Sequence, residues 1–133
     1  MHKLLNIAAG LTTAGWLALA PVAALADTSL GVYQTTDRKM DFALALCGDG
    51  GKELCVTLTA ARDTADVPRV HKFIGKLIID RAKPKGDNVW KGEVKFQKYS
   101  GDGTLTLHPG KNFIMHGCTY IVVCGDFTLI PAQ

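Results

Sequence analysis

The stretch Phe42 to Thr59, FALALCGDGGKELCVTLT, decides the fold of this chain. Apolar residues alternate with small or polar ones on both sides of the glycine-rich segment, which is the period-two pattern of β-strands that bury one face. Cys47 and Cys55 lie at the two ends of that segment. The stretch therefore predicts a β-hairpin joined by its own disulfide. Its apolar face, which we expect to point into the protein, carries Phe42, Leu44, Leu46, Leu54, Val56 and Leu58.

The first 26 residues predict a Sec-type signal peptide and not a part of the fold. A basic start at Lys3 precedes an apolar stretch over 4–20, and Ala24-Leu25-Ala26 has the small-x-small pattern of a cleavage site. A membrane anchor is the alternative, but the apolar stretch is shorter than the roughly 20 residues of a spanning helix. We expect cleavage before Asp27. The prediction is one β-barrel domain over 27–133, periplasmic or secreted from a bacterium, without stable membrane insertion after cleavage.

The four cysteines predict disulfides, because an even number in a small exported chain is typical of them. The alternation places all four on the more polar faces of their strands, outside the barrel. Local pairing, Cys47 with Cys55 and Cys118 with Cys124, requires only that each hairpin forms, and we favour it. The alternative joins Cys47 to Cys118 or Cys124 and requires the two hairpins to be neighbours. The net charge of +3 comes from scattered lysines and arginines, which does not indicate nucleic-acid binding.

The same alternation continues along the chain and predicts about eight antiparallel strands. A short helical turn over 62–72, capped by Asp63 or Asp66 and ended by Gly75, interrupts them. Such short strands favour an all-β barrel or sandwich, and a closed barrel has no exposed edges. Turns are expected at 84–88, 100–103 and 109–110. The strands are expected over 30–35, 41–47, 54–59, 76–81, 89–96, 104–108, 111–118 and 120–130.

An ordered set of short motifs resembles the exported bacterial domain-of-unknown-function 2147 family over nearly all of 27–133. The set comprises Gly31-Val32-Tyr33, Cys47-Gly48 with Leu54-Cys55, Gly75, Trp90-Lys91-Gly92 and Gly117-Cys118. The resemblance implies an antiparallel, lipocalin-like (calycin-type) eight-stranded barrel, an uncharacterised role compatible with ligand binding, and no established catalytic residue.

The chain departs from the family pattern at three places. Tyr33 and Phe127 stand where the family has tryptophans, Leu129 stands where it has arginine, and the turn between the first two cysteines is longer. The tryptophan–arginine contact that closes lipocalin barrels cannot form with these residues. A contact between Tyr33 and Phe127 is the expected replacement.

The inward-facing residues predict a barrel interior that either holds a small apolar or amphipathic ligand or is filled. Trp90 and Met115 are expected in the wall of a pocket, and Gly92 and Gly125 are expected to leave space. The alternative is a structural or envelope-interaction protein with a filled core and no ligand. Besides the pocket candidates, we expect Leu77, Ile79, Val94, Leu105, Leu107 and Val123 to face inward. The pocket candidates are Phe42, Leu44, Val56, Trp90, Phe96, Phe113, Met115 and Phe127.

Motifs for catalysis, cofactors and metals do not occur in the sequence, so we expect a protein that is not an enzyme and uses no cofactor. His108 and His116 flank Pro109-Gly110 and could meet across a hairpin. Two histidines lack the third and fourth ligands of a zinc site, so no metal is predicted. The cysteine spacings do not match the C-x-x-C motif of redox enzymes.

Overall fold

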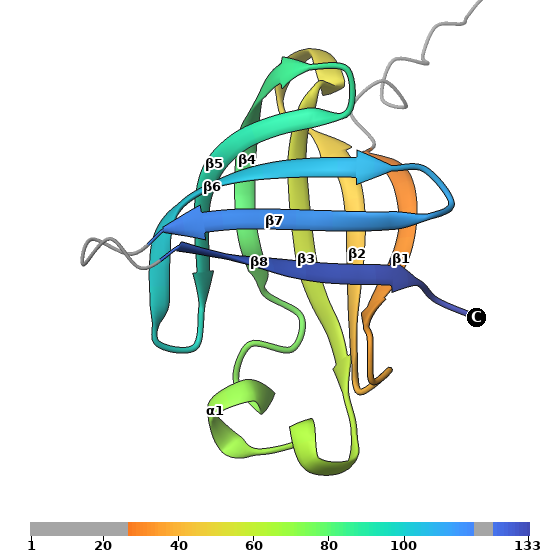
Figure 1. Cartoon of the computed structure of the whole chain (residues 1–133), viewed down its shortest axis with the longest axis vertical. Helices are drawn as coiled ribbons and strands as arrows, with labels where there is room; N and C mark the ends of the chain where they lie inside the picture. Colours follow the sequence, from red (N-terminus) through yellow and green to blue (C-terminus); the bar gives the residue numbers. More distant parts are fainter. Residues whose placement is uncertain (1–26, 119–123) are drawn as a thin grey trace, which may run out of the picture.

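A computed structural model describes residues 27–118 and 124–133, and it has the predicted fold class, a closed barrel of eight antiparallel strands. Each strand pairs with its neighbours in sequence, and β1 pairs with β8 to close the sheet. Figure 1 shows β6, β7 and β8 crossing in front of β1 to β4, as in a lipocalin-like barrel. The strands are β1 (Thr28–Thr35), β2 (Met40–Cys47), β3 (Glu53–Ala61), β4 (Leu77–Gly86), β5 (Val89–Phe96), β6 (Tyr99–His108), β7 (Asn112–Cys118) and β8 (Cys124–Pro131).

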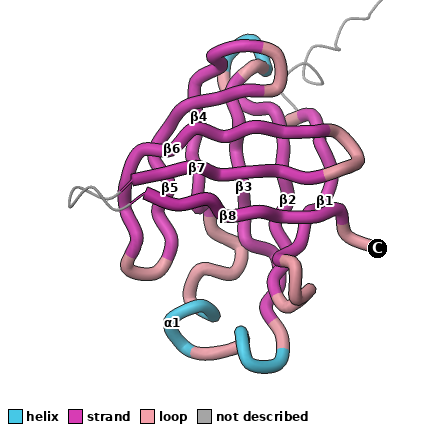
Figure 2. Tube along the Cα trace, in the orientation of Figure 1, coloured by secondary structure: helices cyan, strands magenta, loops and turns pink. Residues whose placement is uncertain are grey.

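The helical segments are short and lie in two connections (Figure 2). They are the 3₁₀ turns η2 (Asp49–Gly51) and η3 (Asp63–Ala65) and the single turn α1 (Pro68–His71). The predicted caps are wrong, because Arg62 and Val67 precede η3 and α1 and neither makes a side-chain capping bond. Asp66 instead contacts His71 Nδ1 at 3.1 Å. Within the described residues, no helix has the length and apolarity to cross a membrane.

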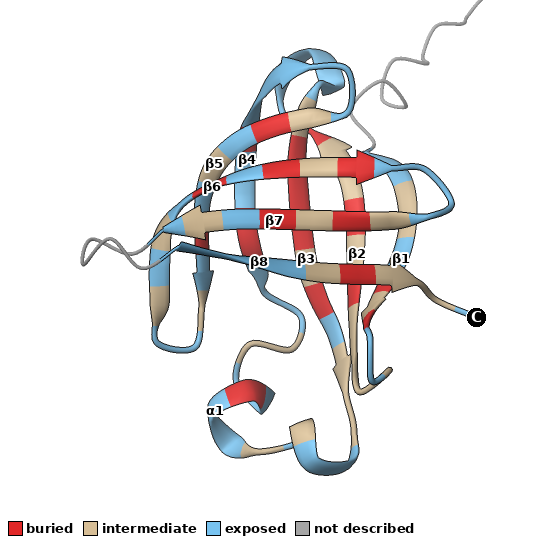
Figure 3. Cartoon of the chain, in the orientation of Figure 1, coloured by how far each residue is buried: buried red, intermediate tan, exposed pale blue. Residues whose placement is uncertain are grey.

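Burial follows the alternation that the sequence predicts, as Figure 3 shows along β6 and β7. The hairpin of β2 and β3 supplies five of the most buried side chains, and only Leu46 on its apolar face is half-buried. The five are Phe42, Leu44, Leu54, Val56 and Leu58.

Both disulfides are the local ones, which confirms the favoured pairing. The Cα atoms are 6.0 Å apart in Cys47–Cys55 and 4.0 Å apart in Cys118–Cys124. Cys47 and Cys55 are buried although they lie on the outer face of their hairpin, whereas Cys118 and Cys124 are exposed. Two such bridges indicate an oxidising environment.

The turn predicted at 100–103 is wrong, and the turn predicted at 84–88 is confirmed only over 87–88. β6 includes 100–103, and the chain turns earlier, at Gln97 with a φ of +57°. β4 continues to Gly86, and the turn follows at Asn88, also with a φ of +57°. The glycines that suggested the first turn serve close packing instead, because a Cβ at Gly101 would lie 3.1 Å from the carbonyl oxygen of Cys118.

The prediction that Leu77 faces inward is also wrong. Leu77 is 46% exposed, whereas its two neighbours Ile78 and Ile79 are 2% and 1% exposed. The register between β3 and β4 shifts twice near Val56, so β4 does not follow simple alternation there. Val123 lies outside the described residues, and β8 is described from Cys124.

The barrel closes through a short seam. β1 and β8 share only three residue pairs, which are Tyr33 with Pro131, Gln34 with Ile130 and Thr35 with Leu129. The hydroxyl of Tyr33 accepts a hydrogen bond from the backbone N–H of Gly110 at 3.3 Å. Tyr33 lies opposite Pro131, which is four residues along β8 from Phe127. The seam is held by the β1–β8 pairing and the Tyr33–Gly110 hydrogen bond in place of the expected contact between Tyr33 and Phe127. The part of β8 before Thr128 pairs with β7 alone.

Candidate ligand-binding cavity

A cavity of about 420 Å³ lies in the end of the barrel where β5 turns into β6 and where β7 ends. That volume is in the range of small-molecule sites in proteins. Four of the eight pocket candidates line it, namely Phe42, Phe96, Met115 and Phe127. Phe127 is 41% exposed and marks the open side.

The other four candidates, Leu44, Val56, Trp90 and Phe113, are buried but do not line the cavity. They fill the rest of the core. The indole Nε1 of Trp90 donates a hydrogen bond to the carbonyl oxygen of Lys52 at 2.9 Å, which places Trp90 beside the β2–β3 turn and satisfies its only polar atom. Trp90 therefore does not form the expected wall of the cavity.

Four glycines in a row across β5 to β8 explain why this end is hollow. Gly92 pairs with Gly103, Gly103 with Gly117, and Gly117 with Gly125. All four glycines lie on the same face of their strands as the buried apolar residues. Four inward positions therefore carry no side chain.

Neighbouring groups refill the glycine row only in part. A Cβ at Gly92 would lie 2.8 Å from the Cβ of Ala82, so the expectation that Gly92 leaves space is wrong. At Gly117 the hydroxyl of Tyr99 occupies the space. Around Gly125 nothing lies within 4 Å of such a Cβ, as expected, and Gly125 lines the cavity.

Sequence reasoning missed several residues of the cavity. Simple alternation from Leu77 and Ile79 would put Ile78 on the outer face, but the irregular register of β4 turns it inward. Tyr99 adjoins 100–103, which the sequence predicts as a turn and which is part of β6. The signal that could have found the site is the placing of glycine at inward positions of four successive strands. Val94, Gly103, His116, Gly117, Cys124 and Asp126 also line the cavity.

Aromatic side chains connect the cavity to the β3–β4 connection. Phe96 makes edge contacts with Phe42, with ring centroids 6.1 Å apart, and with Phe73, at 5.4 Å. Such contacts are favourable beyond simple burial. Phe73 follows α1, so the helical connection supports the wall of the cavity from outside.

The polar side chains of the cavity gather on its open side. His116 Nδ1 contacts the carboxylate of Asp126, and both residues are more than half exposed. A second hollow of about 340 Å³ shares Asp126 and Phe127 with the cavity and is otherwise lined mostly by polar residues. These residues are Thr35, Thr36, Asp37 and Thr128, together with Met40.

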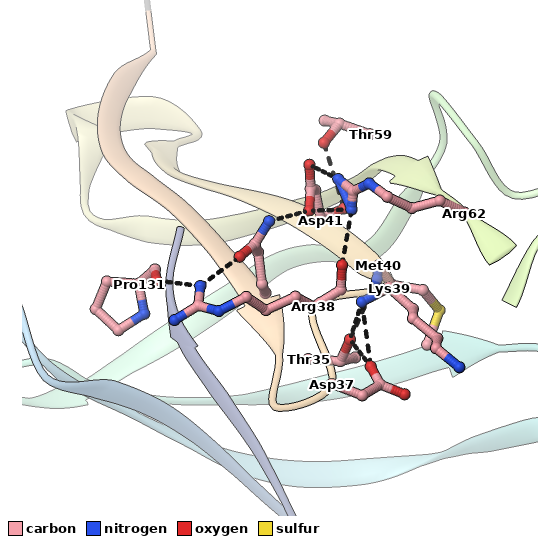
Figure 4. Close-up of polar contacts among 10 residues, drawn as sticks. Thr35, Asp37, Arg38, Lys39, Met40, Asp41, Thr59, Arg62 and Pro131 are labelled. Atoms are coloured by element: carbon pink, nitrogen blue, oxygen red, sulfur yellow. Dashed lines mark hydrogen bonds and ion pairs between the residues drawn. The ribbon is translucent and has the colours of Figure 1, made fainter. Parts of the chain in front are cut away.

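The β1–β2 turn beside the second hollow is fixed by hydrogen bonds, which Figure 4 shows. Thr35 is buried, and its hydroxyl donates to Asp37 Oδ1 at 2.7 Å and accepts from the N–H groups of Lys39 and Met40, each at 3.1 Å. The bond from Thr35, together with that from the Lys39 N–H, lowers the pKa of Asp37 below the ordinary 3.8. Asp37 is therefore ionised at neutral pH.

The arginines near this turn are engaged by other partners (Figure 4). Arg62 forms an ion pair with Asp41. Arg38 donates to the side chain of Gln34 at 2.7 Å and to the carbonyl oxygen of Pro131 at 3.4 Å. These bonds join the turn to the end of β8 across the seam.

His108 and His116 lie apart, and one of the four cysteines lies at the cavity. His108 lies opposite Asn112 and His116 opposite Thr104, so the two histidines do not meet. Across 27–118 and 124–133, no group of three or more His, Cys, Asp or Glu residues is placed to hold a metal ion. Cys124 lies at the cavity, so the cysteines are not all away from it as expected.

Comparisons of the chain with protein family models, with curated proteins and with solved structures find no match.

Proposed function

We propose that this protein binds a small apolar or amphipathic molecule in the open end of its barrel. The observation that carries the proposal is the cavity of about 420 Å³ beside Gly125, whose walls are mainly apolar. Each methylene group that leaves water for such a site contributes about 0.8 kcal/mol, or three- to fourfold in affinity. The rest of the interior is filled, which gives the site a rigid floor.

A substitution that fills the cavity tests the proposal. Gly125 has no neighbour within 4 Å of its Cβ position and no positive φ, so Gly125→Leu adds an apolar side chain at the cavity without a clash at its Cβ. The matched control is Gly86→Leu, because Gly86 is also open but lies at the other end of β4, outside the cavity.

The readout is the fluorescence of N-phenyl-1-naphthylamine, a neutral apolar dye, with thermal unfolding as a second measure. We expect the wild type and Gly86→Leu to bind the dye and Gly125→Leu to lose most of that binding. A ligand at 100 times its Kd stabilises the folded state by about 2.7 kcal/mol. Equal dye binding by all three proteins would place binding outside the cavity. No binding by any of them would favour the structural role with no ligand.

The proposed compartment is the bacterial periplasm or the medium outside the cell. The two disulfides support it, since such bridges persist in oxidising compartments. The signal peptide and the membership of the domain-of-unknown-function 2147 family stay predictions. Amino-terminal sequencing of the protein recovered from the periplasm tests the first, and a chain that begins at Asp27 is the expected result.

A further inference from the structure

The two hollows at the open end differ in polarity and share a boundary. The cavity is lined mainly by apolar side chains, whereas the second hollow combines hydroxyls and carboxylates with the apolar side chains of Met40 and Phe127. Asp126 and Phe127 line both. A molecule with an apolar chain and a polar head can therefore place its chain in the cavity and its head in the second hollow, on either side of Phe127.

The charged groups that line this site are acidic. Asp37 and Asp126 are its two carboxylates, and His116 is the only basic side chain among the described lining residues. Asp37 accepts bonds from Thr35 and from the backbone N–H of Lys39 and forms no ion pair with a lysine or arginine in the described part of the chain, although the charge of Lys39 contributes to its lowered pKa. The sequence of 119–123, TYIVV, adds no acidic, lysine or arginine side chain.

The neighbouring cations have other partners. Lys39 Nζ donates to the hydroxyl of Thr64 at 2.6 Å, and Arg62 pairs with Asp41. Arg38 is held by Gln34 and by the end of β8. The partners of Lys39 and Arg38 are neutral, so both keep their charge, but neither side chain lines the second hollow. A carboxylate head there would meet the carboxylates of Asp37 and Asp126, the second of which also contacts His116 Nδ1, whereas an ammonium head would be attracted to both.

We propose that the ligand is a single-chain amphiphile with a cationic head, with its alkyl chain in the cavity and its ammonium group beside Asp37 and Asp126. The inference rests on the proposed binding function and adds the charge of the ligand. The cavity is the binding site, and the two carboxylates select the head.

Three probes with the same ten-carbon chain test the inference by isothermal titration calorimetry below their micelle concentrations. They are decyltrimethylammonium, decanol and decanoate, measured at pH 8, where decanoate is ionised. We expect the cation to bind about tenfold more tightly than decanoate at low salt, with decanol between them. The preference should shrink in 0.5 M NaCl because the head is near solvent.

The variant Asp37→Asn/Asp126→Asn should lose most of the preference and keep its affinity for decanol. The control Asp87→Asn removes an exposed carboxylate in the β4–β5 turn and should change nothing. If the double variant does not fold, the two single Asn variants and the salt series test whether the carboxylates cause the preference for the cation.

The outcomes separate the two proposals. Decanoate binding as tightly as the cation, or a preference that survives in the double variant, overturns the charge inference and leaves the cavity as a site. Failure of all three probes to bind the wild type overturns the proposed function itself.

Discussion

The glycine row gives the sharpest test of how this barrel is packed. In Gly92→Ala the new Cβ would lie 2.8 Å from the Cβ and 2.9 Å from the Cα of Ala82. Carbon atoms in good contact are about 3.5–4.0 Å apart, so β4 and β5 must separate. Because one of the obstructing atoms belongs to the backbone, no side-chain rotation relieves the contact. Overpacking of this kind costs about 1–3 kcal/mol.

The matched variant is Gly125→Ala in the same row, where nothing lies within 4 Å of the new Cβ. Both substitutions reduce the entropy of the unfolded chain, which stabilises by about 0.4–1 kcal/mol where the native backbone permits it. The difference between the two variants cancels this contribution and leaves the overpacking cost. We expect Gly125→Ala to be as stable as the wild type or slightly more so.

The assay is urea unfolding under non-reducing conditions, with thermal unfolding as a check. A difference of 1 kcal/mol between the variants corresponds to about 4–8 °C in Tm for a domain of this size. If Gly92→Ala and Gly125→Ala agree within about 0.5 kcal/mol, the close contact between β4 and β5 is not as described. Gly117→Ala should fall between them, since the hydroxyl of Tyr99 that it meets can move.

Further predictions concern burial, pH and redox chemistry. Ile78→Ala should cost about 2–5 kcal/mol and Leu77→Ala less than about 0.5 kcal/mol in urea unfolding, and equal costs would contradict the inward position of Ile78. Hydrogen bonds from Lys83 and Arg81 lower the pKa of Glu53 below the ordinary 4.5, so this carboxylate stabilises the fold above that pH. This contribution is lost as the pH falls through the lowered pKa, so the difference in unfolding free energy between the wild type and Glu53→Gln should shrink as the pH falls. A difference that stays constant with pH would refute this. Mild reductant should open the exposed Cys118–Cys124 bridge before the buried Cys47–Cys55 bridge, as peptide mapping after alkylation would show; the reverse order would count against the burial described.

The hairpin of β2 and β3 was predictable because its residues satisfy several requirements at once. Alternation sets which face is buried, and the cysteines at the ends of the turn require both strands to stay in register. The other strands repeat the alternation, so the number of strands follows from the sequence, whereas alternation alone is compatible with a barrel or a sandwich. The composition of a turn is a weaker signal, which is why the β5–β6 turn was misplaced at 100–103.

The cavity was only half predictable because it depends on contacts between strands. Alternation identifies Phe42 and Met115 as inward-facing, but it cannot tell which inward residues lie beside empty space. That depends on the register that aligns the four glycines and on whether Ala82 or Tyr99 reaches them. The double register shift between β3 and β4 likewise leaves no mark in the sequence that would place Ile78 inside.

The order of the strands around the barrel has a consequence for how the chain folds. Seven of the eight strand pairings join consecutive strands, and the eighth, between β1 and β8, is the one strand pairing that joins the two ends of the fold. The entropic cost of closing a long loop therefore falls on one step, the pairing of β1 with β8, whereas each hairpin can form from local contacts. Each disulfide lies within one hairpin, so oxidation of the cysteines does not have to wait for the barrel to close. A half-assembled sheet can thus already carry both of its covalent links.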